Sequence, residues 1–450
     1  MSAAGHRSTR RWGVLAAILL AFAGMWVTAL PAHAISIERV ISPLGIEVWL
    51  VRQATVPIFD LQFAFEGGSS QDPADKPGVG KLAGVLLDEG AGDLDSKTFQ
   101  ERLEARAINL QFQTGRDVTT GSLRSLNEHR DEAVELLRLA LNAPRFDSPA
   151  VERLRGQLLS SLRRETTSPN DIASRQWWAA AFPGHPYGQQ VNGTLESVPN
   201  ITVDDLRSYT KRVFARSNLK IAIVGDVDSV TAGKIVDRVF GALPAQADLR
   251  PVPKADPQGL GRRIVVDLDV PQSVVTFGRV GIARKDPDFM AAYIVSYILG
   301  GGAMSSRLYN EVREKRGLAY SISDNLVWMK GTSVTLGGTA TRSDKTSEAL
   351  ALIESETKRL AENGPTEDEF KKAKSYLKGA YALGLDTSGK IAGALVQIQI
   401  DDLGIDYMDK RNALIDAVTL QDTKRVAKRL FDGKMLVTVV GRPQGVTSRN

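Results

Sequence analysis

The sequence predicts an α+β protein made of two homologous α/β sandwich domains that arose by internal duplication. The two halves of the chain repeat the same order of strand and helix patterns at a nearly constant distance, which indicates a duplication. Within each half, strands and helices are grouped rather than strictly alternating, which favours α+β over a doubly wound sheet. The 450 residues also exceed what one hydrophobic core usually supports.

The repeat is clearest where each half closes. In both places a helical pattern leads into an apolar strand that ends in Val-Gly, and the valines, Val224 and Val440, lie 216 residues apart. The strand-like segments VPIFDLQFAF, from Val56, and VPQSVVTFGRV, from Val270, lie 214 residues apart. The expected organisation is a signal peptide at 1–34, an N-terminal domain at 35–245, a proline-rich linker at 246–261 and a C-terminal domain at 262–450.

Apolar periodicity locates the elements of each half. In the first half the expected strands are 46–51, 56–65, 110–114, 117–126 and 218–227, and the expected helices are 81–88, 96–105, 128–142, 149–165, 172–182 and 203–214. In the second half the expected strands are 270–280, 320–328, 331–341 and 434–443, and the expected helices are 287–299, 306–316, 345–363, 366–383 and 420–431.

The first 34 residues have the pattern of a Sec-type signal peptide. Three arginines form a positive n-region, an uncharged apolar stretch follows at Trp12–Leu30, and Ala32-His33-Ala34 gives the small-x-small cleavage pattern. We expect cleavage after Ala34 and a periplasmic or secreted chain. A twin-arginine export route and an uncleaved membrane anchor remain as alternatives. No later apolar run approaches the ~20 residues that span a bilayer.

Charge and composition exclude several partners. The chain has 57 basic and 52 acidic residues, and three of the basic ones lie in the leader, so the rest is nearly neutral and predicts no nucleic-acid partner. The absence of cysteine excludes disulfides and thiolate metal sites. Beyond the leader only His129 and His185 remain, 56 residues apart, so the sequence offers no cluster with catalytic zinc spacing.

The segment Gly300–Asp324, GGGAMSSRLYNEVREKRGLAYSISD, carries the strongest chemical signal. Ser306 can cap a helix that contains Arg313, Gly317 can end it, and Tyr320 then begins a strand. Across that turn Arg313 and Tyr320 can point into one cleft. A guanidinium can hold peptide carbonyls or a carboxylate, and a phenol can donate to an oxyanion. From these residues alone, a solvated helix face and a half-buried strand tyrosine remain the alternative.

SSRLYNEVREKRGLAYSIS, from Ser305, resembles the second-half segment of the insulinase/pitrilysin-type zinc metallopeptidases, including both members of their Arg/Tyr substrate-binding pair. AFPGHPYGQQVNGTLESVPNIT, from Ala181, resembles their first-half loop, and the resemblance extends over nearly all of the chain beyond the leader. It implies one half of a clamshell, metallopeptidase-like dimer. It also implies that Arg313 and Tyr320 bind substrate and stabilise the transition state in trans.

The zinc motif of that family is missing. H-x-x-E-H usually follows Pro-Gly and supplies two histidine ligands and a glutamate base, but here PGVGKLAGVLLDEGAG, from Pro77, fills its place. A third ligand, a glutamate, usually lies about 76 residues further on. The degenerate zinc-site positions are Lys81, Gly84, Val85 and Ser161, and Leu154 replaces another glutamate that the family usually has. Lys81 can supply a cation of its own at this place.

Together these observations predict a non-catalytic, substrate-binding subunit of an exported heterodimeric zinc metalloendopeptidase that degrades peptides. The chain itself is expected to bind no cofactor and to be inactive alone. Zinc is expected on a homologous partner subunit that keeps the motif, and Arg313 and Tyr320 would serve that partner's site. A structural or peptide-binding assembly protein of the same fold is the alternative, and a self-sufficient zinc peptidase is a third, weaker one.

Overall fold

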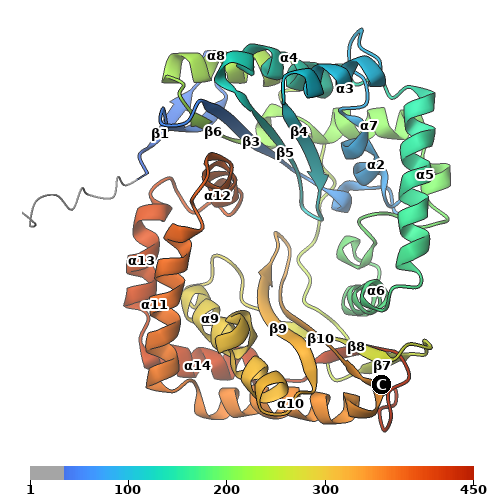
Figure 1. Cartoon of the computed structure of the whole chain (residues 1–450), viewed down its shortest axis with the longest axis vertical. Coiled ribbons are helices and arrows are strands. Elements are labelled where there is room, and N and C mark those ends of the chain that lie inside the picture. The colour runs from blue at the N-terminus through green and yellow to red at the C-terminus, as the bar shows by residue number, and fades with distance from the viewer. Residues whose placement is uncertain (1–34, 450) are drawn as a thin grey trace, which may run out of the picture. The chain divides into compact units, whose positions relative to one another are not determined.

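The structure is a computed structural model that describes residues 35–449. The predicted leader and its cleavage site lie outside the described residues. Two β-sheets, each covered by helices, make up the part of the chain from Ile37 onwards (Figure 1). Among residues 35–449 no helix has both the length and the apolar character that crossing a bilayer requires.

The first sheet has six strands. They are β1 (Ile37–Ile41), β2 (Glu47–Arg52), β3 (Ile58–Glu66), β4 (Asn109–Thr114), β5 (Val118–Leu126) and β6 (Leu219–Gly225). Their spatial order is β1-β2-β6-β3-β5-β4, and β2 and β6 form the one parallel pair of this sheet. Strand β4 therefore lies at an edge and has a neighbouring strand on one side only.

The second sheet repeats this topology. Its strands are β7 (Arg263–Val266), β8 (Gln272–Val280), β9 (Ala319–Trp328), β10 (Ser333–Arg342) and β11 (Leu436–Val440), in the order β7-β11-β8-β10-β9. The register repeats as well, because Leu61 faces Ile223 across β3 and β6, and Val275 faces Val439 across β8 and β11. These pairs have the same 214- and 216-residue offsets as the sequence repeat, so the predicted α+β class and the duplication are confirmed.

Helices on one face of each sheet close the two main cores. In the first half they are α2 (Val79–Leu86), α3 (Ser96–Ala105), α4 (Arg130–Asn142), α5 (Ser148–Glu165), α7 (Val203–Val213) and α8 (Ser229–Phe240). In the second half they are α9 (Phe289–Ser296), α10 (Thr346–Asn363) and α14 (Leu420–Phe431), while α11 (Glu367–Leu383) and α13 (Tyr407–Ala417) pack against α9 in a smaller core. Their apolar stripes bury Phe63 and Phe65 of the first sheet and Phe277 of the second.

Shorter helices connect these elements. The segments η6 (Tyr297–Gly301) and η8 (Tyr309–Glu314) are π-helices. Single 3₁₀ turns are η1 (Ser69–Gln71), η2 (Asn127–His129), η3 (Pro186–Gly188), η4 (Val198–Asn200), η5 (Arg216–Asn218), η7 (Ala303–Ser305) and η9 (Ser343–Lys345).

The two halves exchange one helix each. Helix α6 (Pro169–Ala181) belongs to the first half but packs on β8 and β11 of the second sheet, where the Trp177 indole donates to the Leu436 carbonyl at 3.1 Å. Helix α12 (Ser388–Ile400) belongs to the second half but packs on β3 and β6 of the first, where the Gln399 amide donates to the Ile221 carbonyl at 2.9 Å. Each exchanged helix covers the sheet face opposite to the main core.

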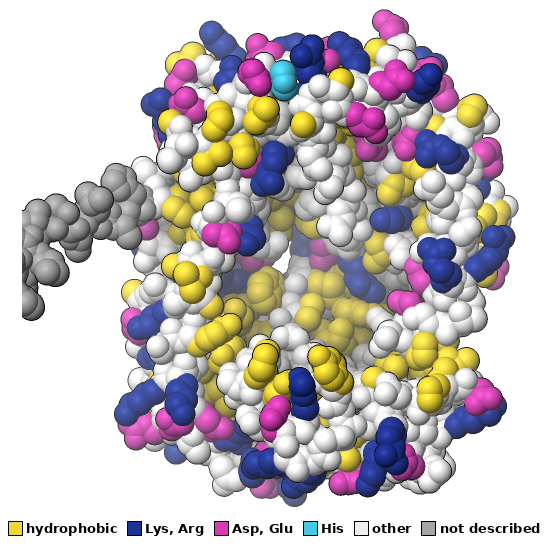
Figure 2. Space-filling model, viewed as in Figure 1, with side chains coloured by type: hydrophobic (Ala, Val, Ile, Leu, Met, Phe, Trp, Pro, Cys, Tyr) yellow, Lys and Arg dark blue, Asp and Glu magenta, His cyan; other side chains and the backbone are white. Residues whose placement is uncertain are grey.

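A buried polar junction also joins the halves. The Tyr187 hydroxyl, which has no exposed surface, donates to the Asp117 carboxylate at 2.8 Å and accepts from the Gly331 amide at 2.9 Å. The Lys330 amide donates to the same carboxylate at 2.8 Å. Near this junction a cavity of 580 Å³ opens between the sheets, and Figure 2 shows the hollow with apolar side chains along it.

Each strand and helix that the sequence predicts has a counterpart in the structure. One predicted helix is wound differently, and several elements of the structure were not predicted. The expected helix 306–316 is wound mainly as the π-helix η8. The sequence analysis missed β1, β7, α8, α12 and α13. The domain boundaries at 35–245, 246–261 and 262–450 stay predictions.

Candidate functional site

The Arg/Tyr segment lies between η6 and β9. The glycine turn 300–302 begins within η6, and the chain then passes through η7 to Ser306, whose hydroxyl accepts from the Tyr309 amide at 3.4 Å. The helix containing Arg313 follows. Gly317, at φ +60°, ends this helix, and its amide donates to the Arg313 carbonyl at 2.8 Å. The predicted cap and stop are therefore both present.

The structure brings Arg313 and Tyr320 into direct contact. The guanidinium carbon of Arg313 lies 4.6 Å from the centroid of the Tyr320 ring and 4.9 Å from that of the Tyr309 ring. Its Nη1 donates to the Tyr309 hydroxyl. These contacts, together with Glu314 at 3.9 Å from Nε, restrict the guanidinium.

Tyr320 is far more exposed than the sequence suggested. Its side chain is 82% exposed although it stands at the second residue of β9, and its hydroxyl makes no hydrogen bond within residues 35–449. A large exposed aromatic ring beside a fixed arginine is unusual for a residue that only packs. The half-buried alternative for Tyr320 is therefore wrong, whereas a shared cleft for the pair stays a prediction.

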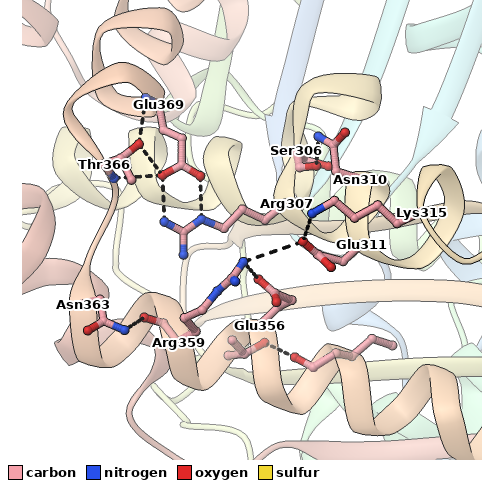
Figure 3. Close-up of polar contacts among 12 residues, drawn as sticks. Ser306, Arg307, Asn310, Glu311, Lys315, Glu356, Arg359, Asn363, Thr366 and Glu369 are labelled. Atoms are coloured by element: carbon pink, nitrogen blue, oxygen red, sulfur yellow. Dashed lines mark hydrogen bonds and ion pairs between the residues drawn. The ribbon is translucent and has the colours of Figure 1, made fainter.

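Ion pairs hold the other side of the Arg313 helix (Figure 3). Arg307, whose side chain is 10% exposed, forms a two-bond fork with Glu369 at 2.6 and 2.7 Å. Glu369 is at the same time part of the capping box of α11, together with Thr366. Glu311 accepts from Lys315 at 2.6 Å, and Arg359 of α10 lies within 3.9 Å of it. These contacts fix the Arg313 helix against α10 and α11.

The glycine turn is fixed by a close contact with β9. A Cβ at Gly300 would lie 2.3 Å from the Asp324 backbone nitrogen and 2.7 Å from the Asp324 Cβ, so only glycine fits. Asp324 itself is fully buried, both of its carboxylate oxygens lack a hydrogen-bond partner, and burial raises its pKa to about 6. The charged group that acts on it is the Arg279 guanidinium, which is 3% exposed. The sequence did not single out Asp324, because an aspartate in a strand of alternating polar and apolar residues is expected to face solvent.

Most of the degenerate zinc-site positions lie together. Lys81, Gly84 and Val85 on α2 and Leu154 on α5 line one cavity of 540 Å³, whereas Ser161, further along α5, does not line it. A Cβ at Gly84 would lie 2.9 Å from Thr114 Oγ1, which is itself bonded to the Gly80 carbonyl at 2.9 Å. A glutamate at residue 84 would thus require Thr114 to move.

The residues present do not fit a zinc ion. A lysine, a glycine and an aliphatic residue stand where ligands and base would be needed, and none of them is a usual zinc ligand. Within residues 35–449 no group of three or more His, Cys, Asp or Glu side chains is placed to hold a metal ion.

Helix α2 is nevertheless firmly held. The Asp72 carboxylate accepts from the Gly78 and Gly80 amides at 2.8 Å each and so caps the start of the helix. Burial raises the pKa of Asp72 to about 7 in spite of these bonds. Just after the other end, Glu89 pairs with Arg153 of α5 and is only 12% exposed.

Comparison with known proteins places the chain in a family. The family model described as insulinase (peptidase family M16) matches residues 48–195, and the model described as peptidase M16 inactive domain matches residues 200–377. The chain belongs to this family of insulinase-type metallopeptidases, and it lacks the H-x-x-E-H motif while keeping the Arg/Tyr pair.

Individual relatives agree on the fold. The chain is 28% identical to the non-peptidase homolog YmxG of Helicobacter pylori over 74% of its length and 77% of that protein, and 26% identical to an uncharacterized zinc protease of Streptomyces coelicolor over 87% and 85%. It matches the crystal structure of a peptidase M16 inactive domain from Pseudomonas fluorescens with a TM-score of 0.85 and 27% identity, covering 92% of this chain and 100% of that one. A protease from Helicobacter pylori shares the fold, with a TM-score of 0.82, 20% identity, and coverage of 91% and 100%.

Proposed function

We propose that this chain is the non-catalytic, substrate-binding subunit of an exported heterodimeric zinc metalloendopeptidase that degrades peptides. The observation that carries this proposal is the contact of Arg313 with an exposed Tyr320, on a helix that ion pairs hold in place. The loss of usual ligands at residues 81, 84 and 85 supports a role without a metal of its own.

The pair would act on a peptide held at the zinc site of a homologous partner subunit. The Tyr320 phenol would donate a hydrogen bond to the oxyanion that forms when the amide is attacked. The Arg313 guanidinium would hold peptide carbonyls or a carboxylate in its fixed fork. The zinc of the partner would supply the activated water, and this chain would supply neither metal nor base.

Export is part of the proposal. The leader pattern of residues 1–34 supports a periplasmic or secreted complex, and the nearly neutral remainder of the chain supports peptides rather than nucleic acid as substrates.

Co-expression with a homologue that keeps H-x-x-E-H tests the proposal. The complex should hydrolyse unfolded peptides in a zinc-dependent way, and Arg313→Ala and Tyr320→Phe should each lower the rate about 10²–10³-fold, as the loss of an oxyanion donor does. Arg342→Ala and Tyr376→Phe are matched controls, because both residues are exposed on the same half and lie outside the pair. Unchanged rates in the Arg313 and Tyr320 variants would refute it.

The second candidate is a structural or peptide-binding assembly protein of the same fold. The H. pylori relative whose name calls it a non-peptidase homolog favours this alternative. It would be preferred if the chain forms a stable complex or binds peptides but no zinc-bearing partner gains activity from it.

A further inference from the structure

A second cavity of the C-terminal half, 490 Å³ in volume, lies among helices and is lined largely by tyrosine rings. Its walls come from α9, η6, α11, α12 and α13, and Figure 1 shows α11 and α13 side by side. Tyr293 and Tyr297 stand one helical turn apart in one wall, and Tyr381 of α11 belongs to another. A concave site of this size, rich in aromatic rings, is typical of small-molecule binding.

Arg411 of α13 is a buried cation in the wall of this cavity. It is only 6% exposed, and it forms no ion pair with any of residues 35–449. Its Nη1 donates to the Leu377 carbonyl at 3.1 Å, whereas Nε and Nη2 have no hydrogen-bond partner within the same residues. A buried guanidinium without a counter-ion is costly, so a ligand that brings a negative charge gains by binding here.

The surroundings of Arg411 favour an anion. Of residues 35–449, no aspartate or glutamate lines this cavity. Carboxylates on adjoining elements pair with other cations: Asp386 with Lys390, Asp401 with Arg284, and Asp416 with Lys378. Lys390, the other cation in the wall, is therefore already neutralised, and Arg411 keeps its charge for a ligand.

The rings beside Arg411 indicate which anion fits. The guanidinium carbon lies 4.2 Å from the centroid of the Tyr381 ring and 5.9 Å from that of the Tyr293 ring. In an arginine, Nε and Nη2 donate in parallel along one edge of the plane, which matches the two oxygens of a single carboxylate. An aryl group attached to that carboxylate by a short linker would reach the tyrosine rings, and aromatic pairs of this kind attract one another.

We propose that this cavity binds a small aromatic monocarboxylate. Its carboxylate lies in the Nε–Nη2 fork of Arg411, and its ring packs against Tyr293, Tyr297 and Tyr381. One fork balances one negative charge, so a monocarboxylate fits better than a doubly charged phosphate. The site needs neither zinc nor a partner subunit, and it goes beyond the proposed function without depending on it.

Isothermal titration of the purified chain with phenylacetate tests the proposal. Phenylacetate should bind, whereas phenylacetamide, which has the same shape but no charge, should bind about ten-fold more weakly or less. Cyclohexylacetate keeps the charge but lacks the aromatic ring, and it should bind about three-fold more weakly than phenylacetate.

Three variants locate the site. Arg411→Met should lower the affinity for phenylacetate to that for phenylacetamide. Lys390→Met is the matched control, because it removes the other cation of the same wall, which is exposed and already paired, and it should keep the difference between the two ligands. Ala380→Trp fills the cavity from α11 and should abolish binding while Arg411 stays in place, so it tests the site independently of the arginine variant. Far-ultraviolet circular dichroism checks that the variants are folded.

Equal affinity for phenylacetate and phenylacetamide would overturn the proposal, as would the absence of phenylacetate binding at millimolar concentration. A charge preference that persists in Arg411→Met or disappears in Lys390→Met would overturn the role of Arg411. Unchanged binding in Ala380→Trp would place the ligand outside this cavity, and equal binding of cyclohexylacetate would overturn the role of the rings. No zinc, partner or hydrolysis enters these measurements, so their failure is distinct from that of the peptidase test.

Discussion

Tyr320 and Arg313 show how two residues on different elements become one chemical unit. The left-handed Gly317 turns the chain back on itself, so the last turn of η8 and the start of β9 lie side by side. Tyr309, one helical turn before Arg313, contacts the same guanidinium. The guanidinium is thereby held in place, which under the proposed function would reduce the entropy that substrate binding must offset.

Asp324 predicts an unusual pH dependence of stability. An aspartate ordinarily has a pKa near 3.9, whereas burial raises that of Asp324 to about 6. Between these values the folded chain keeps a proton that the unfolded chain has released, so this group lowers stability as the pH rises from about 4 to 6. The side chain of Asp324→Asn cannot ionise, so the stability of this variant does not fall in this way as the pH rises. Relative to the unmodified chain, its unfolding free energy should therefore improve by about 2–3 kcal/mol between pH 4 and pH 7.

Urea unfolding at the two pH values measures this difference. Asp344→Asn is a control that should show little difference between the two pH values, because the Arg342 guanidinium lowers the pKa of Asp344 below its usual range and the folded carboxylate is ionised at both. If Asp324→Asn shows the same stability difference at both pH values, the desolvation argument is wrong.

At the scale of single residues, the sequence predicted the features that depend only on spacing along the chain. The cap, the glycine stop and the seven-residue spacing from Arg313 to Tyr320 are all local. The structure confirms the cap and the stop and adds the direct contact of Arg313 with Tyr320, while a shared cleft stays a prediction. The roles of Tyr309, Asp324 and Thr114 depend on which strand lies under which helix. That information is absent from any single window of the sequence, so these residues could not be singled out.

The π-helices η6 and η8 are the most informative elements of the second half. Each π-turn inserts a residue into a helix, and such insertions are frequent at functional sites. Here η6 contains Gly300, which contacts β9, and η8 contains Arg313, which reaches Tyr320. Periodicity over 306–316 predicted a helix but could not distinguish π from α winding.

The fork between Arg307 and Glu369 is expected to stabilise the Arg313 helix. Glu369→Gln keeps a residue suited to the capping box of α11 but removes the charge opposite a guanidinium that is 10% exposed. We expect a loss of about 2–3 kcal/mol in unfolding free energy, because the buried guanidinium is left without its counter-ion. Thermal or urea unfolding measures it.

Glu367→Gln is the matched control for this prediction. It removes a carboxylate from the same helical turn, but Glu367 and its partner Lys371 are 68% and 70% exposed. An exposed pair of this kind contributes little to stability, because solvent screens it. Equal losses in the two variants would contradict the argument that burial makes the Arg307 fork important.

Two of the elements that were not predicted from the sequence, β1 and α12, lack a clear apolar stripe. Strand β1 is an exposed edge with one buried residue, so it lacks an apolar pattern. Helix α12 buries one face on the first sheet but carries apolar residues outside that face as well, such as Ala394 and Ile400, so its sequence shows no narrow apolar stripe. Periodicity detects such stripes, and neither of these elements has one.

The whole molecule is held together by more than its linker. Each half covers the inner face of the other's sheet with one helix, and the Tyr187–Asp117–Gly331 junction adds buried hydrogen bonds between them. The duplication was predictable from the 214–216-residue offsets. The exchange of α6 and α12 was not predictable, because the apolar pattern of a helix indicates that the helix is buried but not on which sheet it packs.

Cleavage of the linker should therefore leave the halves associated. A protease site inserted between Ala245 and Gln246, both exposed, would be cut without touching either exchanged helix. We expect the two fragments to elute together in size-exclusion chromatography under native conditions and to separate only in denaturant. Uncut protein with the same insertion is the control, and separation in native buffer would disprove the mutual hold of the exchanged helices.

The exchanged helix α12 also imposes an order on biosynthesis. Strands β3 and β6 are complete well before residues 388–400 leave the ribosome, so the face that they offer to this helix has no cover for most of translation. Contacts between segments so distant in sequence are slow to form, and apolar surface that waits for them invites misassembly. The first half of this polypeptide should thus depend on a holding chaperone until its C-terminal portion arrives.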